Sequence, residues 1–177
     1  MARSFTDKSE KPDAIALLKA DHRTVEELFE KFESARGKDS KQKIAEKICT
    51  ELKIHAMIEE EIFYPACEGA VEEDLLKEAY VEHDGAKMLI NEIEAGGPEE
   101  EFYDAKVKVL SEMILHHVEE EEKRVEGMFS QARKAGLDMD DLGERMMARR
   151  EELQAQAEGP GLPPAQTTTL NGAQPTA

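Results

Sequence analysis

The stretch His55-Ala56-Met57-Ile58-Glu59-Glu60-Glu61-Ile62-Phe63-Tyr64-Pro65 places an imidazole and a carboxylate four residues apart within an apolar helical pattern. On a helix, residues i and i+4 lie on one face, so His55 and Glu59 point to the same place. The apolar residues of that face are Ile44, Ile48, Leu52 and Ile62. A face that should be buried therefore carries a base and an acid, and buried charges are tolerated mainly when they are paired or bind metal. The pattern indicates half of a metal site.

A second copy of this pattern, His117-Val118-Glu119-Glu120-Glu121, follows 62 residues later. Each copy is preceded by a histidine on another apolar helical face: His22 lies 33 residues before His55, and His83 lies 34 residues before His117. Two such hairpins packed face to face bring four imidazoles and two carboxylates together. The repeat thus predicts a ligand set for two metal ions.

Apolar residues that recur every three or four positions predict four long helices with short connections. The helices are expected from Asp13 to near Gly37, from about Ser40 to Ala66, from about Glu72 to Ala95 and from about Glu99 to Lys134. The fourth helix should bury a stripe that includes Leu110, Ile114 and Val125. The sequence thus predicts an all-α fold, an antiparallel up-down four-helix bundle.

The C-terminal part is expected to add a short fifth helix and a disordered tail. The helix should run from Met139 to about Gln156, with Asp138 as its N-cap and Leu142, Met146 and Leu153 as its apolar face. Residues 157–177 are rich in Gly, Pro, Ala, Gln and Thr and contain no aromatic residue, so they should not order themselves. Residues 1–12 are expected to be a flexible N-terminus, which leaves one domain at residues 13–156.

The composition excludes several classes of partner. A net charge of −17 argues against binding to nucleic acid or to an anionic membrane, because both need clustered Lys and Arg. Cys49 and Cys67 form no CxxC motif and fit buried thiols in a reducing compartment. No apolar run approaches a transmembrane length, and the N-terminus lacks a signal-peptide core. We therefore expect a cytoplasmic protein.

Imidazole and carboxylate ligands suit iron, manganese or zinc, and carboxylates can bridge two ions while imidazoles cap them. Two metals about 4 Å apart with incomplete ligand shells leave room for a small exogenous ligand. Cysteine is absent from the set, which disfavours an iron–sulfur cluster or a structural zinc site.

Several motifs of the chain resemble those of the hemerythrin-like, or HHE cation-binding, domain family. The matching elements are Asp21-His22, His55-x-x-x-Glu59-Glu60 followed by Tyr64-Pro65, Glu82-His83, and His116-His117-Val118 with Glu121, within about residues 13–135. The resemblance implies a bundle with a non-haem di-iron centre. It also implies that Glu59 and Glu121 bridge the irons and that His22, His55, His83 and His117 cap them. Members of the family bind oxygen, sense oxygen or iron, or handle nitric oxide or peroxide.

The chain departs from the oxygen-carrying hemerythrins four residues after His83, where they have a fifth histidine and this sequence has Lys87. One iron should then be less saturated, or Lys87, Glu60 or a nearby tyrosine should compete for the open position. Oxygen carriage becomes less favoured than turnover or sensing. A second alternative concerns two adjacent histidines: the apolar stripe favours His117 as the ligand, and His116 would then pair with Glu120.

The leading functional hypothesis is a di-iron protein that acts on oxygen, peroxide or nitric oxide in a protective or sensing role. The alternatives are catalase- or peroxidase-like turnover, and an iron-responsive interaction module whose output is the fifth helix or the tail. A metal-free structural bundle is the least favoured. The expected partner is a small diatomic ligand or peroxide, and the oligomeric state is left open. The residue types do not exclude manganese or zinc.

Overall fold

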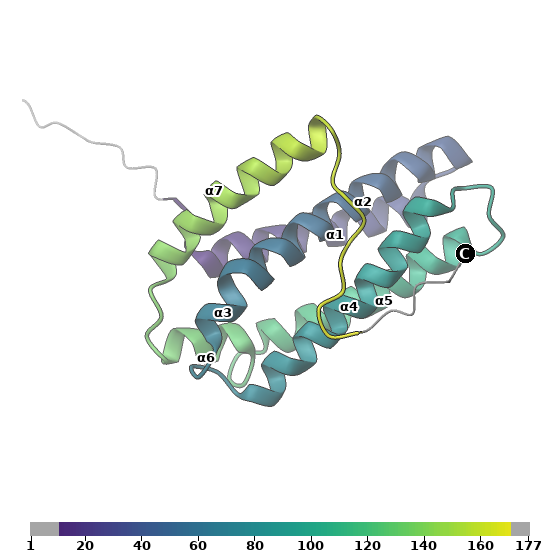
Figure 1. Ribbon diagram of the computed structural model, residues 1–177. Helices are drawn as coiled ribbons and strands as arrows, with labels where there is room; N and C mark the ends of the chain where they lie inside the picture. The colour runs from purple at the N-terminus through teal and green to yellow at the C-terminus, as the bar shows by residue number, and fades with distance from the viewer. Residues whose placement is uncertain (1–10, 171–177) are drawn as a thin grey trace, which may run out of the picture.

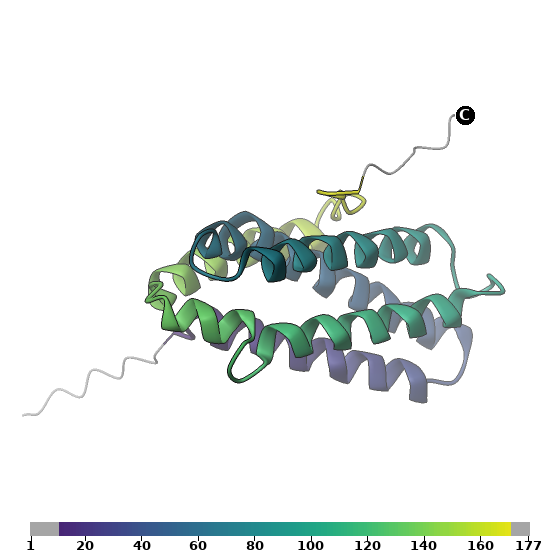
Figure 2. The same ribbon diagram turned by 90° about the horizontal axis from the view of Figure 1, so that it is seen from below.

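Four long helices run alongside one another in a computed structural model of the chain, which describes residues 11–170 (Figures 1 and 2). They are α1 (Ala14–Ser34), α2 (Lys38–Ile58), α4 (Glu73–Ala95) and α5 (Tyr103–Glu122). Helix α1 contacts α2 and α5, and α4 contacts the same two helices, so the four close into a bundle. Residues 11–170 form no strand, and none of their helices is long and apolar enough to cross a membrane. The predicted all-α fold is confirmed.

The sequence predicts that the second long helix continues to Ala66, but the regular α-helix ends at Ile58. After α2, a π-helical turn covers Glu59–Phe63 (η1), and a last short helix, α3, covers Tyr64–Cys67. The Tyr64 N–H donates to the carbonyl of Glu59, five residues earlier. The wider turn suits Pro65, which lacks an N–H and would clash with the carbonyl of a regular preceding turn.

This π turn changes which side chains share a face. Residues five apart on a regular α-helix point roughly 140° away from each other. Here Glu59 and Tyr64 are both fully buried, and the Tyr64 hydroxyl donates to Glu59 Oε2 at 3.3 Å. The turn therefore delivers a carboxylate and a phenol to the same place in the core.

The predicted fourth helix, Glu99–Lys134, is wrong as one continuous element. Helix α5 ends at Glu122, and α6 (Met128–Lys134) follows a loop. Val125, predicted to be buried, lies in this loop and is 79% exposed. The end of α5 carries four consecutive glutamates, Glu119–Glu122, at the negative end of the helix dipole, which disfavours its continuation.

Helix α7 (Met139–Glu158) lies across the bundle against α1, α2 and η1. Its N-cap, Asp138, accepts from the Asp141 N–H at 3.0 Å, as predicted. Its apolar face is also as predicted, with Leu142, Met146 and Leu153 buried. The helix begins at Met139 and ends at Glu158, two residues beyond the predicted end near Gln156.

Replacement of Gly143 by Ala is expected to destabilise the chain. Gly143 lies where α7 meets the start of α1, and a Cβ there would lie 2.8 Å from both the Ala14 nitrogen and the Pro12 carbonyl oxygen. Backbone atoms cannot rotate away, so the cost should be about 1–3 kcal/mol of unfolding free energy in a urea titration. If no such contact existed, the same replacement would increase the free energy of unfolding, because Ala is more favourable than Gly in a helix interior by roughly 1 kcal/mol.

The apolar core consists of two clusters that lie toward opposite ends of the bundle. One includes Phe29, Phe32, Ile48 and Ile93. The other joins α1, η1, α6 and α7 through residues such as Leu18, Phe63, Met128 and Met146. Cys49 and Cys67 are buried free thiols, as predicted, and burial raises the pKa of each to about 12. Most of the buried polar residues, such as His22 and His83, occupy helix positions between the two clusters and form a polar layer.

The C-terminal segment differs from the disordered tail that its composition predicts. Residues 159–170 contain no helix, but they cross from the end of α7 to α4 (Figure 1). Asn91 of α4 exchanges two hydrogen bonds with the Ala165 backbone, at 2.8 and 2.9 Å. The amides of Thr168, Thr169 and Leu170 donate to the Asp84 carboxylate. Polar anchors on α4 thus order a segment that has little to bury. The predictions for residues 1–10 and 171–177 lie outside the described residues.

Candidate metal centre

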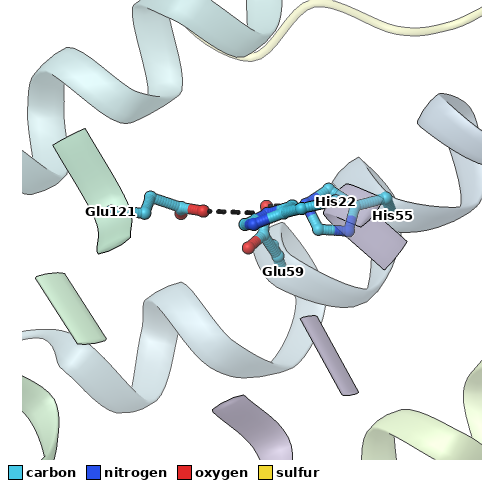
Figure 3. A group of neighbouring side chains, drawn as sticks. All are labelled: His22, His55, Glu59 and Glu121. Carbon is cyan, nitrogen blue, oxygen red and sulfur yellow. Dashed lines mark hydrogen bonds and ion pairs between the residues drawn. The ribbon is translucent and has the colours of Figure 1, made fainter. Parts of the chain in front are cut away.

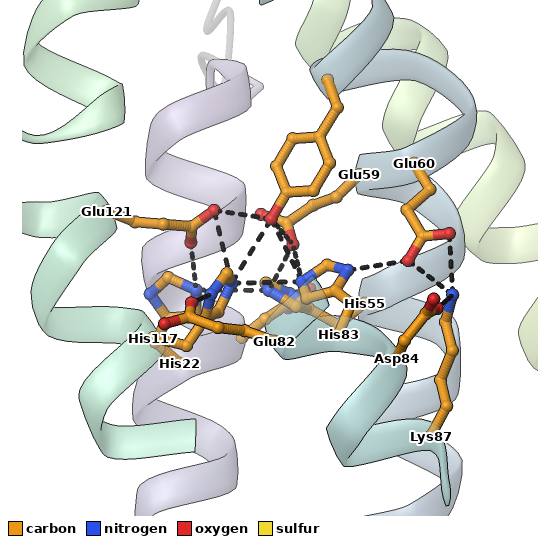
Figure 4. A network of polar contacts seen from close by, with 12 residues as sticks. His22, His55, Glu59, Glu60, Glu82, His83, Asp84, Lys87, His117 and Glu121 are labelled. Atoms are coloured by element: carbon orange, nitrogen blue, oxygen red, sulfur yellow. Dashed lines mark hydrogen bonds and ion pairs between the residues drawn. The ribbon is translucent and has the colours of Figure 1, made fainter. Parts of the chain in front are cut away.

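Four histidines from the four long helices converge in the polar layer (Figure 4). The Nε2 atoms of His22 (α1) and His55 (α2) lie 3.2 Å apart, and those of His83 (α4) and His117 (α5) lie 3.1 Å apart. All four side chains are buried. Each hairpin of the internal repeat therefore contributes one histidine from each of its helices, as the sequence predicts.

Two buried carboxylates connect these histidine pairs. Glu59 Oε2 lies 3.1 Å from His55 Nε2 and 3.2 Å from His83 Nε2. Glu121 reaches from α5 to His22, at 3.3 Å (Figure 3), and lies 3.5 Å from His117. Each carboxylate thus faces one imidazole of each pair, which is the position that a bridging ligand needs.

The donor atoms fall into two groups, each with its ligand atoms within 4.8 Å of one another. The first comprises His22, His55, Glu59 and Glu121, and the second comprises Glu59, His83 and His117. Glu59 Oε1 and Glu121 Oε2 are buried and accept no hydrogen bond. An unsatisfied buried oxygen costs about 1–3 kcal/mol, and more when it is charged, unless a cation satisfies it. The donor set therefore fits two metal ions that share Glu59.

The Tyr64 hydroxyl lies within the second group. It is 3.1 Å from His83 Nε2, 3.3 Å from His117 Nε2 and 3.0 Å from Glu121 Oε1. Burial and the neighbouring Glu121 and Glu59 carboxylates raise the pKa of this phenol well above its usual value. Among the candidates for the open position, Tyr64 places its hydroxyl next to the Nε2 atoms of this group, whereas Glu60 contacts the outer nitrogen, Nδ1, of His83.

A second set of carboxylates holds the outer nitrogen, Nδ1, of every one of these histidines. The pairs are His22–Glu122 at 2.7 Å, His55–Asp21 at 3.5 Å, His83–Glu60 at 2.9 Å and His117–Glu82 at 2.7 Å. Each carboxylate also contacts a basic side chain: Arg23, Arg150, Lys87 and His116, respectively. Such partners fix the imidazole tautomer with Nε2 free for a metal.

The carboxylates favour the protonated forms of His55 and His83 in the metal-free chain. Burial alone lowers the pKa of His83, but hydrogen bonds to Glu59 and Glu60 outweigh it and raise this pKa from 6.5 to about 9. Burial likewise opposes a charge on His55, while Glu59 and Asp21 raise its pKa well above the usual value. A metal ion must displace these protons, so its binding should release them.

The metal-free chain is therefore expected to lose stability as the solution becomes basic. The pKa of His83 is higher in the folded chain than in the unfolded chain, so its protonation stabilises the fold fully below about pH 6.5. This stabilisation disappears as the pH rises through about 9. For His83 the loss amounts to roughly 3 kcal/mol at most. Urea midpoints at the two ends of this range measure it. Equal midpoints would contradict the assignment of the charge to His83.

The structure brings together all six residues that the sequence singles out, and their role as metal ligands stays a prediction. The predicted pairing of His116 with Glu120 is wrong: His116 is 63% exposed and pairs with Glu82 at 3.4 Å. The Lys87 ammonium group pairs with Glu60 at 2.7 Å and with Asp84 at 3.3 Å. One feature of the sequence indicates that Tyr64 lies near the histidines: Pro65 follows it and favours the π turn.

These features define a class: a four-helix bundle with a buried, carboxylate-linked histidine centre for cations. The model of the hemerythrin HHE cation-binding domain matches residues 13–129. The chain belongs to this hemerythrin family.

Two known proteins show how far the similarity extends. A solved structure of a hemerythrin HHE cation-binding domain-containing protein from Mycobacterium kansasii matches 85% of this chain and 95% of its own, with a TM-score of 0.69 and 22% identity. At that identity, the match shows the shared fold. A DNA nickase from Nostoc sp. is 29% identical over 106 residues, which are 60% of this chain and 30% of the relative. The chain thus spans less than a third of that relative's length.

Proposed function

We propose that this protein holds two iron ions between its histidine pairs and uses them on oxygen, peroxide or nitric oxide in a protective or sensing role. One observation carries the proposal: two buried carboxylates, each with one oxygen that accepts no hydrogen bond, lie among four convergent imidazoles. Iron is chosen over manganese and zinc by the family resemblance, because the ligand types accept all three.

Each group of the centre has a distinct role. His22 and His55 would hold one ion, and His83 and His117 the other. Glu59 belongs to both groups and Glu121 faces His22 and His117, so both carboxylates would connect the ions. Iron supplies the capacity to bind or reduce small oxygen or nitrogen species. The outer carboxylates keep the Nδ1 protons in place, which orients each ring and makes Nε2 a better donor.

A small cavity adjoins this centre and sets the size of what can react. It has a volume of about 20 Å³ and is lined by the four histidines and by apolar residues that include Val25, Leu52, Ile90 and Ile114. Such a volume accommodates about one water-sized molecule. Asp21 and Lys87 complete the lining, and the small volume favours a diatomic molecule or peroxide over a larger substrate.

The test is the metal content and visible spectrum of anaerobically purified chain, before and after air and then peroxide. Iron at about two ions per chain, with a spectrum that changes on exposure to air, would support the proposal. A stable change would favour binding, and rapid oxygen release from peroxide would favour catalase-like turnover. If the purified protein contains no iron and has no affinity for iron, the proposal is refuted.

A second candidate is an iron-responsive module, and one contact favours it. Thr168 of the C-terminal segment donates to Glu60 Oε2 at 2.8 Å, and Glu60 Oε1 contacts His83 Nδ1. Occupancy of the centre can therefore bias this segment, since metal binding and folding are coupled. Proteolysis with and without iron tests it: equal cleavage rates within residues 159–170 would remove this candidate.

A further inference from the structure

The C-terminal segment Pro163–Leu170, here called the strap, covers a pocket on the side of the bundle. This outer pocket has a volume of about 300 Å³. Its inner wall includes Lys53, Met57 and Glu60, and its outer wall is the strap itself. The strap lies on the surface of α4 in both ribbon views (Figures 1 and 2). The pocket thus exists because the strap is closed.

The outer pocket and the cavity between the histidines share two lining residues, Ala56 and Lys87. Alanine is too short to fill the space, so the Lys87 side chain is the main barrier between the two volumes. Lys87 is only 6% exposed. Its ammonium group lies 2.7 Å from Glu60 Oε1 and 3.3 Å from Asp84 Oδ1. The barrier is therefore held in place by two charged contacts.

The strap and the barrier are fastened to the same carboxylates. Asp84 accepts hydrogen bonds from the Thr168, Thr169 and Leu170 amides, at 2.8, 2.5 and 2.8 Å, and contacts Lys87 (Figure 4). Thr168 Oγ1 donates to Glu60 Oε2, which also accepts from Lys87. Opening the strap thus removes partners from both carboxylates that position Lys87.

We propose that the strap and Lys87 form a gate on the route from solvent to the metal centre. The closed strap limits entry to the outer pocket, and Lys87 limits passage to the cavity between the histidines. Molecules of diatomic or peroxide size pass during brief openings, while larger reductants and chelators stay outside. The gate rests on the proposed function for its purpose, but its existence can be measured without metal.

The measurement uses diethyl pyrocarbonate, which modifies imidazole nitrogens, on the metal-free full-length chain. Peptide mass spectrometry gives the modification rate at His22 and His117, neither of which contacts Lys87 among the described residues. His116, exposed at the surface, is the internal reference. Amide exchange within α1 and α5 reports whether each variant keeps the fold.

Two variants open the gate at different points. Asn91→Ala removes both hydrogen bonds to Ala165, far from the histidines, and Lys87→Ala removes the inner barrier. We expect modification of His22 and His117 to rise about tenfold in each, the factor that one to two lost hydrogen bonds produce. In Asn91→Ala, the amides of residues 168–170 should also exchange about tenfold faster.

Lys53→Ala is the matched control. Lys53 is another lysine that is 6% exposed and paired with a carboxylate, Glu94 at 3.0 Å, but it lines the outer pocket without lining the inner cavity. It should leave modification of His22 and His117 within about twofold of the parent, as expected where no barrier is lost. Rates in Asn91→Ala and Lys87→Ala that match those of Lys53→Ala would overturn the gate. If Lys87→Ala fails to fold, Asn91→Ala decides alone.

An iron-loaded arm separates this proposal from the proposed function. Nitric oxide should associate with the iron(II) chain about tenfold faster in Asn91→Ala than in Lys53→Ala, by the same hydrogen-bond arithmetic. Equal association rates in the two variants would refute the proposed gate without affecting the proposal of an iron centre. A chain that takes up no iron would refute the proposed function, while the metal-free modification rates would still decide the gate.

Discussion

Replacement of Glu59 by Gln is expected to reduce the metal content of the chain from about two ions to one or none, with affinity lower by about 100-fold or more. Glu59 is fully buried and belongs to both donor groups. Two divalent ions about 4 Å apart repel by roughly 17 kcal/mol at an effective dielectric constant of 20, so a shared negative ligand is needed. The neutral Gln side chain cannot supply that charge.

Metal analysis after dialysis and calorimetric titration measure this effect, and Glu61→Gln is the matched control. Glu61 lies in the same π turn but points to the surface, where it pairs with Arg149 of α7 at 2.7 Å. The control should keep the parent metal content and lose less than about 1 kcal/mol of stability. Parent-like metal binding in Glu59→Gln would show that the ions, if any, lie elsewhere.

Replacement of Tyr64 by Phe should remove any phenolate absorption from the iron(III) chain. The hydroxyl lies about as close to His83 Nε2, at 3.1 Å, as His117 Nε2 does, so it points to the place that an ion would occupy. A metal ion inverts the local preference that otherwise keeps a phenol neutral. The metal-free variant should also lose about 1–3 kcal/mol, because Glu121 Oε1 loses a buried donor.

Visible spectra and urea titrations test both parts of this prediction, with Tyr80→Phe as the control. The Tyr80 ring packs edge-on against Tyr64, with centroids 5.1 Å apart, so it shares the environment. The control should retain the parent spectrum. An unchanged spectrum in Tyr64→Phe would mean that the hydroxyl lies outside the coordination shell.

The helical period allowed a large part of the fold to be predicted. The third predicted helix, about Glu72–Ala95, agrees closely with α4, and Asp13 caps α1 as expected, accepting from the Ala16 N–H at 2.8 Å. The predicted continuous helices failed where the local pattern was misleading. The π turn at Glu59–Phe63 and the loop before α6 both have apolar residues at helical spacing in the sequence. Their backbone hydrogen bonds nevertheless differ from those of an α-helix.

The candidate ligands could be read from spacing because i and i+4 residues on a buried face must be satisfied together. Nothing in the sequence spacing pairs His22 with Glu122, 100 residues away, or His55 with Asp21, 34 residues away. These contacts join different helices, and helix packing alone brings them within hydrogen-bond range. The same holds for the strap, whose composition predicts disorder until Asn91 and Asp84 supply its anchors.

The sequence by itself determined the bundle, its internal repeat and the six residues at its centre, because each follows from local periodicity and from the cost of burying charge. The tertiary structure decided what surrounds them: the phenol of Tyr64, the outer carboxylates, and the strap with Lys87 beneath it. These depend on contacts between segments far apart in the chain, whose relative positions no local pattern encodes.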